Sequence, residues 1–157
     1  MNDEKTALAN QVYETLCGFI EKRNWQFGKN EEELLVHFGI SGKDVPMHFV
    51  LFVDAERQLI RLSSPLPFKM IEEKRTEGAV AACVASYGMV DGSFDYDLED
   101  GTVAFRMTAS FKESLIGEGL FGYMIDCSAA TVEKYNDKFL AIDTGELEIT
   151  DFIASEL

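Results

Sequence analysis

The order of hydrophobic periodicities is the feature that most constrains the fold of this chain. Alternation of apolar and polar residues, which is typical of strands, occupies residues 34–64 and 93–108, and helical periodicity occupies the segments before, between and after them. Short polar turns separate successive strands, and such turns favour antiparallel hairpins. The sequence therefore predicts an α+β fold in the order αβββαββα, with helices packed on a five-stranded antiparallel sheet.

The bounds of the elements follow from the same patterns. Pro65 and Pro67 are expected to end the first group of strands, because proline cannot donate a hydrogen bond to a sheet. The tail from residue 146 to 157 is expected to form a last helical turn or two. The other expected elements are helix 3–22, strands 34–40, 45–53 and 58–64, helix 71–87, strands 93–98 and 102–108, and helix 121–142.

Turn lengths predict how the strands pair. Residues 41–44 suit a four-residue loop and Asp100-Gly101 suits a two-residue turn. This register makes one face of each hairpin apolar, because successive side chains of a strand point to opposite faces. The predicted pairs are Leu34–Leu51, Val36–Phe49, Phe38–Met47, Ile40–Val45, Leu51–Ile60, Phe49–Leu62, Phe94–Met107, Tyr96–Phe105 and Leu98–Val103, with Asp95 opposite Arg106 on the other face.

The outer face of the first three strands is also partly apolar. The predicted register places Leu35 opposite Val50 and Phe52 opposite Leu59, where a sheet with one solvated face should carry polar residues. Either the chain's own segments cover this face, such as the first helix or residues 25–27, or a partner protein does. Leu35, Val50, Phe52 and Leu59 are therefore the candidate partner-binding residues.

The only two histidines lie on the same face. The predicted register sets His37 directly opposite His48, close enough to share a ligand. A zinc site needs three or four ligands, however, and the flanking positions supply none. The pair is interpreted as a fortuitous neighbour contact with no metal site, and a small-molecule or metal-binding domain that uses this face is the alternative function.

Length and composition favour one domain over residues 1–157. The chain is 46% apolar and 11% aromatic, which suits a folded core. Its start lacks a secretory signal, and no apolar run approaches the roughly 20 residues that span a bilayer. We expect a cytoplasmic protein with no membrane partner.

The charge is strongly acidic and unevenly placed. The net charge is −14, and residues 79–157 carry 15 acidic against 4 basic side chains. Such a field repels phosphate backbones, so nucleic acid is not expected as a partner. The acidity either keeps the protein soluble or attracts basic partners.

No grouping of residues suggests catalysis or a cofactor. Cys17, Cys83 and Cys127 are odd in number and lie on separate predicted helices, away from both histidines. The glycines of residues 117–122 do not match a phosphate-binding motif, and the acids of residues 91–100 do not match a calcium loop. The prediction is a protein that is not an enzyme and has no cofactor.

Four stretches of the sequence, taken with the order of elements, form a recognisable pattern. They are the hairpin from Gly39-Ile40 to Val53, the Leu66-Pro67 break, the residues from Gly92-Ser93-Phe94 through Asp100-Gly101 to Arg106, and the last helix from Tyr123-Met124-Ile125 to Val132-Glu133-Lys134-Tyr135. In these features the chain, from the first helix to about Gly145, resembles the bacterial YbjN-like family, which shares a fold with type III secretion chaperones.

The resemblance implies an acidic domain that acts by binding other proteins. It implies a homodimer that forms through a helix and a sheet edge, and, as in the secretion chaperones, an exposed apolar surface that holds an unfolded stretch of a partner. From the residues and the resemblance together we expect a non-enzymatic domain, chaperone-like or regulatory, with an unidentified protein partner. Capture of an extended peptide by strand addition or by contacts on the apolar outer face is the expected mechanism.

Overall fold

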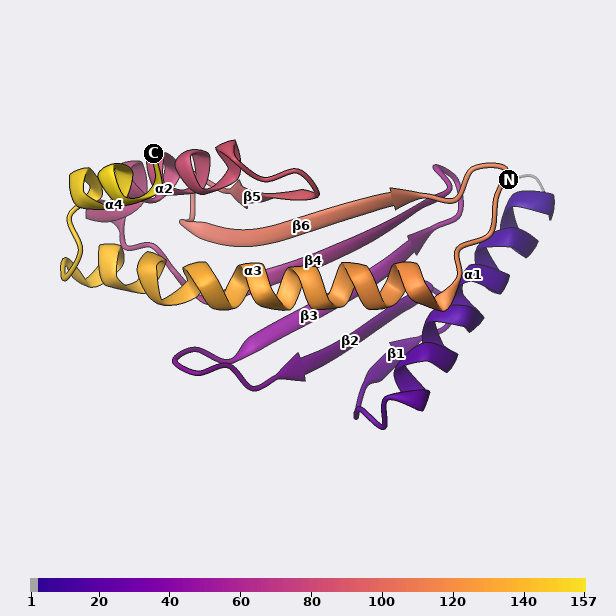
Figure 1. Cartoon of the computed structure of the whole chain (residues 1–157). Helices are drawn as coiled ribbons and strands as arrows, with labels where there is room; N and C mark the ends of the chain where they lie inside the picture. Colours follow the sequence, from indigo (N-terminus) through magenta and orange to yellow (C-terminus); the bar gives the residue numbers. More distant parts are fainter. Residues whose placement is uncertain (1–2) are drawn as a thin grey trace.

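A computed structural model describes residues 3–157, and it confirms the α+β class. Four α-helices and one antiparallel sheet make up this part of the chain (Figure 1). Six strands form the sheet, so the prediction of five is wrong. The elements are α1 (Asp3–Lys22), β1 (Gly28–Asn30), β2 (Leu35–Ile40), β3 (Met47–Asp54), β4 (Leu59–Lys69), the 3-10 turn η1 (Glu72–Lys74), α2 (Arg75–Tyr87), β5 (Gly92–Tyr96), β6 (Thr102–Ser110), α3 (Glu118–Thr144) and α4 (Ile149–Glu156).

The sheet has the order β1-β2-β3-β4-β6-β5, and every neighbouring pair is antiparallel. The unpredicted strand is β1, which has only three residues and pairs Lys29 with Val36. Three residues are too few to display an alternation, so the pattern left no signal. The Asn30 side chain supports the turn that follows, because its Oδ1 accepts hydrogen bonds from the backbone N–H groups of Glu32 and Glu33.

The predicted register is wrong by two residues in all three hairpins. Because the shift is even, every side chain stays on the face that was predicted for it. The first loop spans residues 41–46 and the last spans residues 97–101, so both are longer than expected. The observed pairs include Val36–Leu51, Phe38–Phe49, Ile40–Met47, Leu51–Leu62, Val53–Ile60, Phe94–Phe105 and Tyr96–Val103.

The prolines do not end the sheet as predicted. Strand β4 continues through Pro65 and Pro67 to Lys69, with an irregular register against β6 after Pro65. The pairing of β3 with β4 stops at Ser63, so both prolines lie beyond the residues that pair with β3. Proline is tolerated at such irregular positions because the regular ladder of hydrogen bonds has already ended or shifted there.

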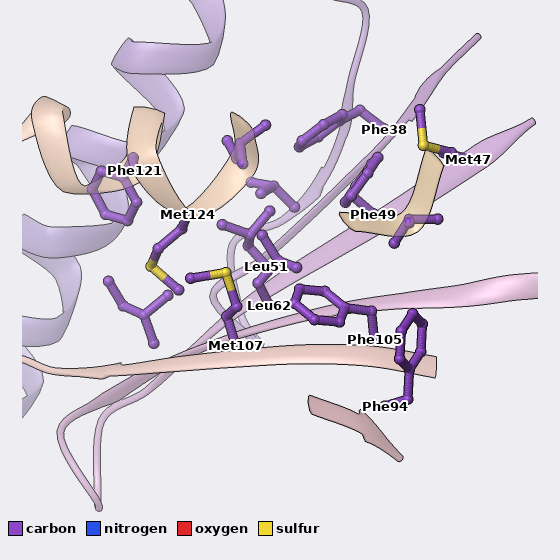
Figure 2. Packing of buried hydrophobic residues seen from close by; sticks show 14 of the residues in the cluster. Phe38, Met47, Phe49, Leu51, Leu62, Phe94, Phe105, Met107, Phe121 and Met124 are labelled. Atoms are coloured by element: carbon purple, nitrogen blue, oxygen red, sulfur yellow. The ribbon is translucent and has the colours of Figure 1, made fainter. Parts of the chain in front are cut away.

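The helices lie against one face of the sheet. Figure 1 shows α3 crossing that face. Helix α1 lies near the N-terminal end of α3, and α2 and α4 lie near the C-terminal end of α3. The inward-facing residues of the strands meet α3 in one apolar core, part of which Figure 2 shows. The largest of its fully buried side chains include Phe49, Leu51, Leu62, Phe105 and Phe121.

The expected helices are present with modified ends. The second helix begins as η1 rather than as α-helix, and α3 is longer than predicted at both ends. The tail forms α4, whose Phe152 is buried beside the ring of Tyr135, with ring centroids 6.5 Å apart. Small residues of α2, among them Gly78 and Ala82, are buried within the chain, so this side of the helix is not free for a second copy.

Candidate partner-binding face

The face of the sheet opposite the helices is open. We call it the open face, and it consists of the strand residues that alternate with the buried ones. On β3 and β4 the buried side chains of Phe49 and Leu62 alternate with exposed His48 and Arg61. Within residues 3–157, no helix covers this face, which leaves a two-layer molecule with one solvated side.

The four predicted partner-binding residues lie together on the open face. Leu35 of β2 pairs directly with Phe52 of β3, and Val50 lies two residues along β3 on the same face. Leu59 of β4 pairs with Asp54, which places it diagonally from Phe52. All four apolar side chains are half-buried, because strand neighbours shield their sides and no other segment of residues 3–157 forms a layer above them. We call these four residues the apolar patch.

The predicted contacts within the apolar patch were wrong in detail. Leu35 faces Phe52 instead of Val50, and Phe52 faces Arg61 instead of Leu59. These are consequences of the two-residue shift in register. The shift also makes Arg61, an exposed residue of β4, the strand neighbour of Phe52 on the open face.

Within residues 3–157, the chain's own segments do not cover the apolar patch. The ring of Trp25 lies 5.3 Å from that of Phe38, which points into the core, and it stays on the helix side of the sheet. Helix α1 is on that side as well, where the Tyr13 hydroxyl donates a hydrogen bond to the Leu35 carbonyl oxygen at 3.2 Å. Both segments that were expected to cover the outer face therefore belong to the core side.

The two histidines are neighbours but not direct partners. His37 pairs with Val50 and His48 with Gly39, yet the two imidazole rings lie 5.8 Å apart across the diagonal. The ring of His37 also lies over Gly28, where a Cβ atom would come within 2.2 Å of Nε2. In the part of the chain that the structure describes, no group of three or more His, Cys, Asp or Glu side chains could hold a metal ion.

Charge on the open face is close to balanced, although the chain carries −14. Arg106 donates two hydrogen bonds to Asp95, at 2.6 and 3.0 Å, and this contact raises the pKa of the guanidinium. The prediction that Asp95 lies directly opposite Arg106 is wrong, because Asp95 pairs with Ala104 and Arg106 with Ser93; the two charged side chains meet across the diagonal. Arg61 makes no ion pair with any residue of the range 3–157. The acidic excess therefore lies mainly outside the open face.

At the edge of the sheet, a second ion pair joins the end of β4 to the last hairpin. The Lys69 ammonium binds the Asp100 carboxylate, and the backbone N–H of Thr102 donates to the same side chain at 2.9 Å. The contact with Lys69 is the main cause, and those with Thr102 add to it; together they hold the pKa of Asp100 well below its ordinary range.

A groove of about 630 Å³ adjoins the apolar patch at one end of the sheet. It lies where the turn of residues 31–34, the turn of residues 55–58 and the start of α1 meet. Leu35 and Phe52 line both the groove and the apolar patch, so the two are continuous. Sequence reasoning missed this end groove, although the run Glu31-Glu32-Glu33 before Leu34 was visible as an acidic turn.

A second groove of about 460 Å³ lies between α2, α3 and α4. Glu156 closes one side of it, where its carboxylate accepts a hydrogen bond from the Tyr135 hydroxyl at 2.8 Å and another from Lys138. Exposed apolar side chains surround this region, with Tyr87 84% and Val90 95% exposed. It is a second surface on which another chain could pack.

The cysteines show no catalytic arrangement among the described residues. Cys17 is buried, and burial raises the pKa of its thiol, which opposes nucleophilic reactivity. Cys83 is exposed on α2 and Cys127 is half-buried on α3. Within residues 3–157, no helix combines the length and the apolar character that a membrane span needs.

Comparisons with known proteins connect this geometry to two solved structures. No protein-family model matches the sequence, and no curated protein matches it. Among solved structures, the chain resembles YbjN from E. coli, a candidate transcription regulator, with a TM-score of 0.57 and 10% identity, over 83% of this chain and 95% of that one. It also resembles a chain of the HopA1-SchA chaperone-effector complex, with a TM-score of 0.53 and 10% identity, over 82% and 96% of the two chains. The chain therefore has a YbjN-like, chaperone-like fold.

Proposed function

We propose that this chain is a non-enzymatic protein-binding domain, chaperone-like or regulatory, which holds an extended apolar segment of another protein against its open face. The observation that carries the proposal is the apolar patch of Leu35, Val50, Phe52 and Leu59, four neighbouring side chains that no layer of the described chain covers. Contiguous exposed apolar surface rimmed by polar residues is typical of interaction sites. The fold shared with a chain of a chaperone-effector complex supports the same interpretation.

Binding across the face suits the patch better than strand addition. Strand β3 already pairs with β2 and β4, so it has no free backbone groups to offer beside Val50 and Phe52. Of the sheet edges, β1 is only three residues long, and on β5 the Phe94 N–H already donates to the Ser86 hydroxyl at 2.8 Å. Short or occupied edges resist pairing with another strand. The partner is therefore expected to contribute side chains rather than a seventh strand.

The expected affinity is moderate. Covering apolar surface contributes about 25 cal/mol per Å², and association loses several kcal/mol of translational and rotational freedom. Because the four side chains are already half-buried, covering them can exceed that loss by only a modest amount of binding free energy. Such a complex would release its partner readily, as a carrier or a regulator needs.

The test compares two open-face variants. Val50→Ser with Phe52→Ser should weaken binding to a reduced, carboxymethylated polypeptide that stays unfolded, measured by fluorescence anisotropy, while the melting temperature changes little. Thr108→Ser, on the same face but outside the apolar patch, is the matched control and should bind like the parent chain. Equal binding by all three proteins would remove the apolar patch as the docking surface, and loss of folding in the double variant would show that these residues belong to the core.

We also propose that the chain forms a homodimer through the surface around α2. The exposed apolar side chains of Tyr87 and Val90 support this, together with Leu157, which is 75% exposed. Tyr87→Glu with Val90→Glu should convert a dimer into a monomer in light scattering after size exclusion. Leu98→Glu, an exposed apolar site in the last hairpin loop, is the control. A monomeric parent chain would contradict the dimer and leave the open-face proposal intact.

A further inference from the structure

The end groove is lined by both apolar and acidic residues. Its apolar residues are Leu34, Leu35, Phe52, Val53 and Ala55, its acidic residues are Glu31, Glu32, Glu33 and Glu56, and Thr6 and Asn10 of α1 complete the lining. No lysine or arginine of the described chain lines it. An apolar lining favours an apolar side chain, and carboxylates beside it favour a cation next to that side chain.

Most of these carboxylates are available to a ligand. Glu31 pairs with Lys29 at 2.9 Å, whereas Glu32, Glu33 and Glu56 form no ion pair within residues 3–157, although the Glu33 carboxylate accepts one hydrogen bond from the Asn30 amide at 3.2 Å. Lys5 is near, but its ammonium donates to the Glu56 backbone carbonyl at 3.2 Å rather than to the carboxylate. Three like charges gathered around one groove repel one another, and a bound cation would relieve that repulsion.

The walls of the end groove are held in place by local structure. The turn at residues 31–34 is fixed by two hydrogen bonds to Asn30 Oδ1 and ends in Leu34, whose carbonyl oxygen accepts a hydrogen bond from the Val53 N–H at 3.0 Å. The turn at residues 55–58 is fixed by the Asp54 carboxylate, which accepts from the Arg57 N–H at 2.9 Å. Both glutamate-bearing turns are therefore anchored to the end of β3, which also carries Phe52.

We infer that the end groove selects the partner by charge, binding an extended segment in which lysine or arginine flanks an apolar residue. The inference rests on the proposed function, since the apolar residues of the same segment would continue onto the apolar patch through Leu35 and Phe52. The net charge of −14 would add long-range attraction for such a segment. The acidity of the chain then serves recognition in addition to solubility.

The experiment uses three short labelled peptides with a Gly-Ser background and a central Leu-X-Phe-X-Leu, where X is Arg, Ser or Glu. Fluorescence anisotropy should show the Arg peptide binding about tenfold tighter than the Ser peptide, and the Glu peptide weakest. Raising the salt concentration should reduce the preference for Arg, because these charges are at the surface.

A charge-matched pair of variants separates the end groove from net charge. Glu32→Gln with Glu33→Gln and Glu56→Gln should reduce the preference for the Arg peptide to about twofold or less. Glu72→Gln with Glu73→Gln and Glu146→Gln removes the same charge from exposed sites outside the groove and should keep the preference. Neither set removes a buried side chain, so both proteins should fold.

Each outcome bears on a different claim. Equal binding of the Arg and Ser peptides to the parent chain would overturn the charge selection while leaving the open-face proposal standing. An equal loss of preference in both triple variants would assign the effect to net charge and also overturn the inference. If no peptide binds and the unfolded polypeptide binds the Val50→Ser, Phe52→Ser variant as well as the parent, the proposed function itself is wrong and the inference falls with it.

Discussion

The two faces of the sheet are built from the same strands yet have opposite physical roles. On the helix side, Phe49 and Phe105 have at most 1% of their surface exposed, in a continuous apolar core. On the open face, Val50 and Phe52 are one residue away from core positions and keep contact with solvent. Because the core side chains bury more apolar surface, we expect them to contribute more to the stability of the fold than those of the apolar patch. This difference is what makes the open face a candidate binding surface.

The largest effect is expected on the helix side. Phe49→Ala should lower the free energy of unfolding by about 3–5 kcal/mol, because it leaves a cavity in a packed core. Urea denaturation of the variant and the parent chain measures the difference. A loss below about 1 kcal/mol would mean that side chains on the two faces contribute equally to stability, which would contradict the proposed difference between the faces.

On the open face, the same kind of change should cost much less. Val50→Ser with Phe52→Ser should lower the free energy of unfolding by about 1 kcal/mol or less, since both side chains already contact solvent. The urea midpoints of this variant and of Phe49→Ala, measured side by side, provide the contrast. A cost close to that of the core variant would show that another part of the molecule packs on the apolar patch.

The ion pair of the open face should contribute little. Asp95→Asn should lower the free energy of unfolding by about 0.5 kcal/mol at low salt, because both side chains of the pair are well exposed. Repeating the thermal melts at high salt should remove most of the difference. A large cost that salt does not change would indicate that the pair is shielded from solvent.

A pH effect is expected at the edge of the sheet. The pKa of Asp100 is lowered in the folded chain by Lys69 and Thr102, so its carboxylate favours folding when it is ionised. This contribution is present above the ordinary carboxyl pKa of about 4 and disappears as the pH falls further. Asp100→Asn should therefore be less stable than the parent chain at neutral pH, and the two melting curves should converge in acid.

The smallest effect is expected from metal. Zinc should leave the melting temperature unchanged, because His37 and His48 have no third ligand among the described residues. His48→Ala is the control for any shift that occurs. A rise in melting temperature that this variant abolishes would restore the metal-binding alternative and give the open face a second role.

Sequence reasoning identified the faces of the sheet correctly and the register wrongly, for one physical reason. Alternation assigns each side chain to a face but determines the pairing only in steps of two residues. The remaining choice depends on turn conformation. Gln58 adopts a left-handed conformation, with φ of 55°. Glycine is the residue that usually predicts this conformation, and the sequence has none at this position.

The candidate site was predicted in part. Leu35, Val50, Phe52 and Leu59 could be found because they break the polar half of an alternation, which is a signal within each strand. The end groove could not be found in that way, since it joins α1 to two turns that are far apart in the sequence. Its position follows from how β1 and the turn at residues 31–34 meet the end of β3, and β1 is too short to be recognised from a pattern.

Because no helix of residues 3–157 covers the open face, the residues on this face are less constrained in evolution than those of the core. Positions on this face can be replaced without repacking the interior, so they are free to change together. The fold then acts as a constant frame for an exchangeable surface. For protein engineering, randomising the outward positions of β2, β3 and β4 should yield a library in which most members fold and differ mainly in what they bind.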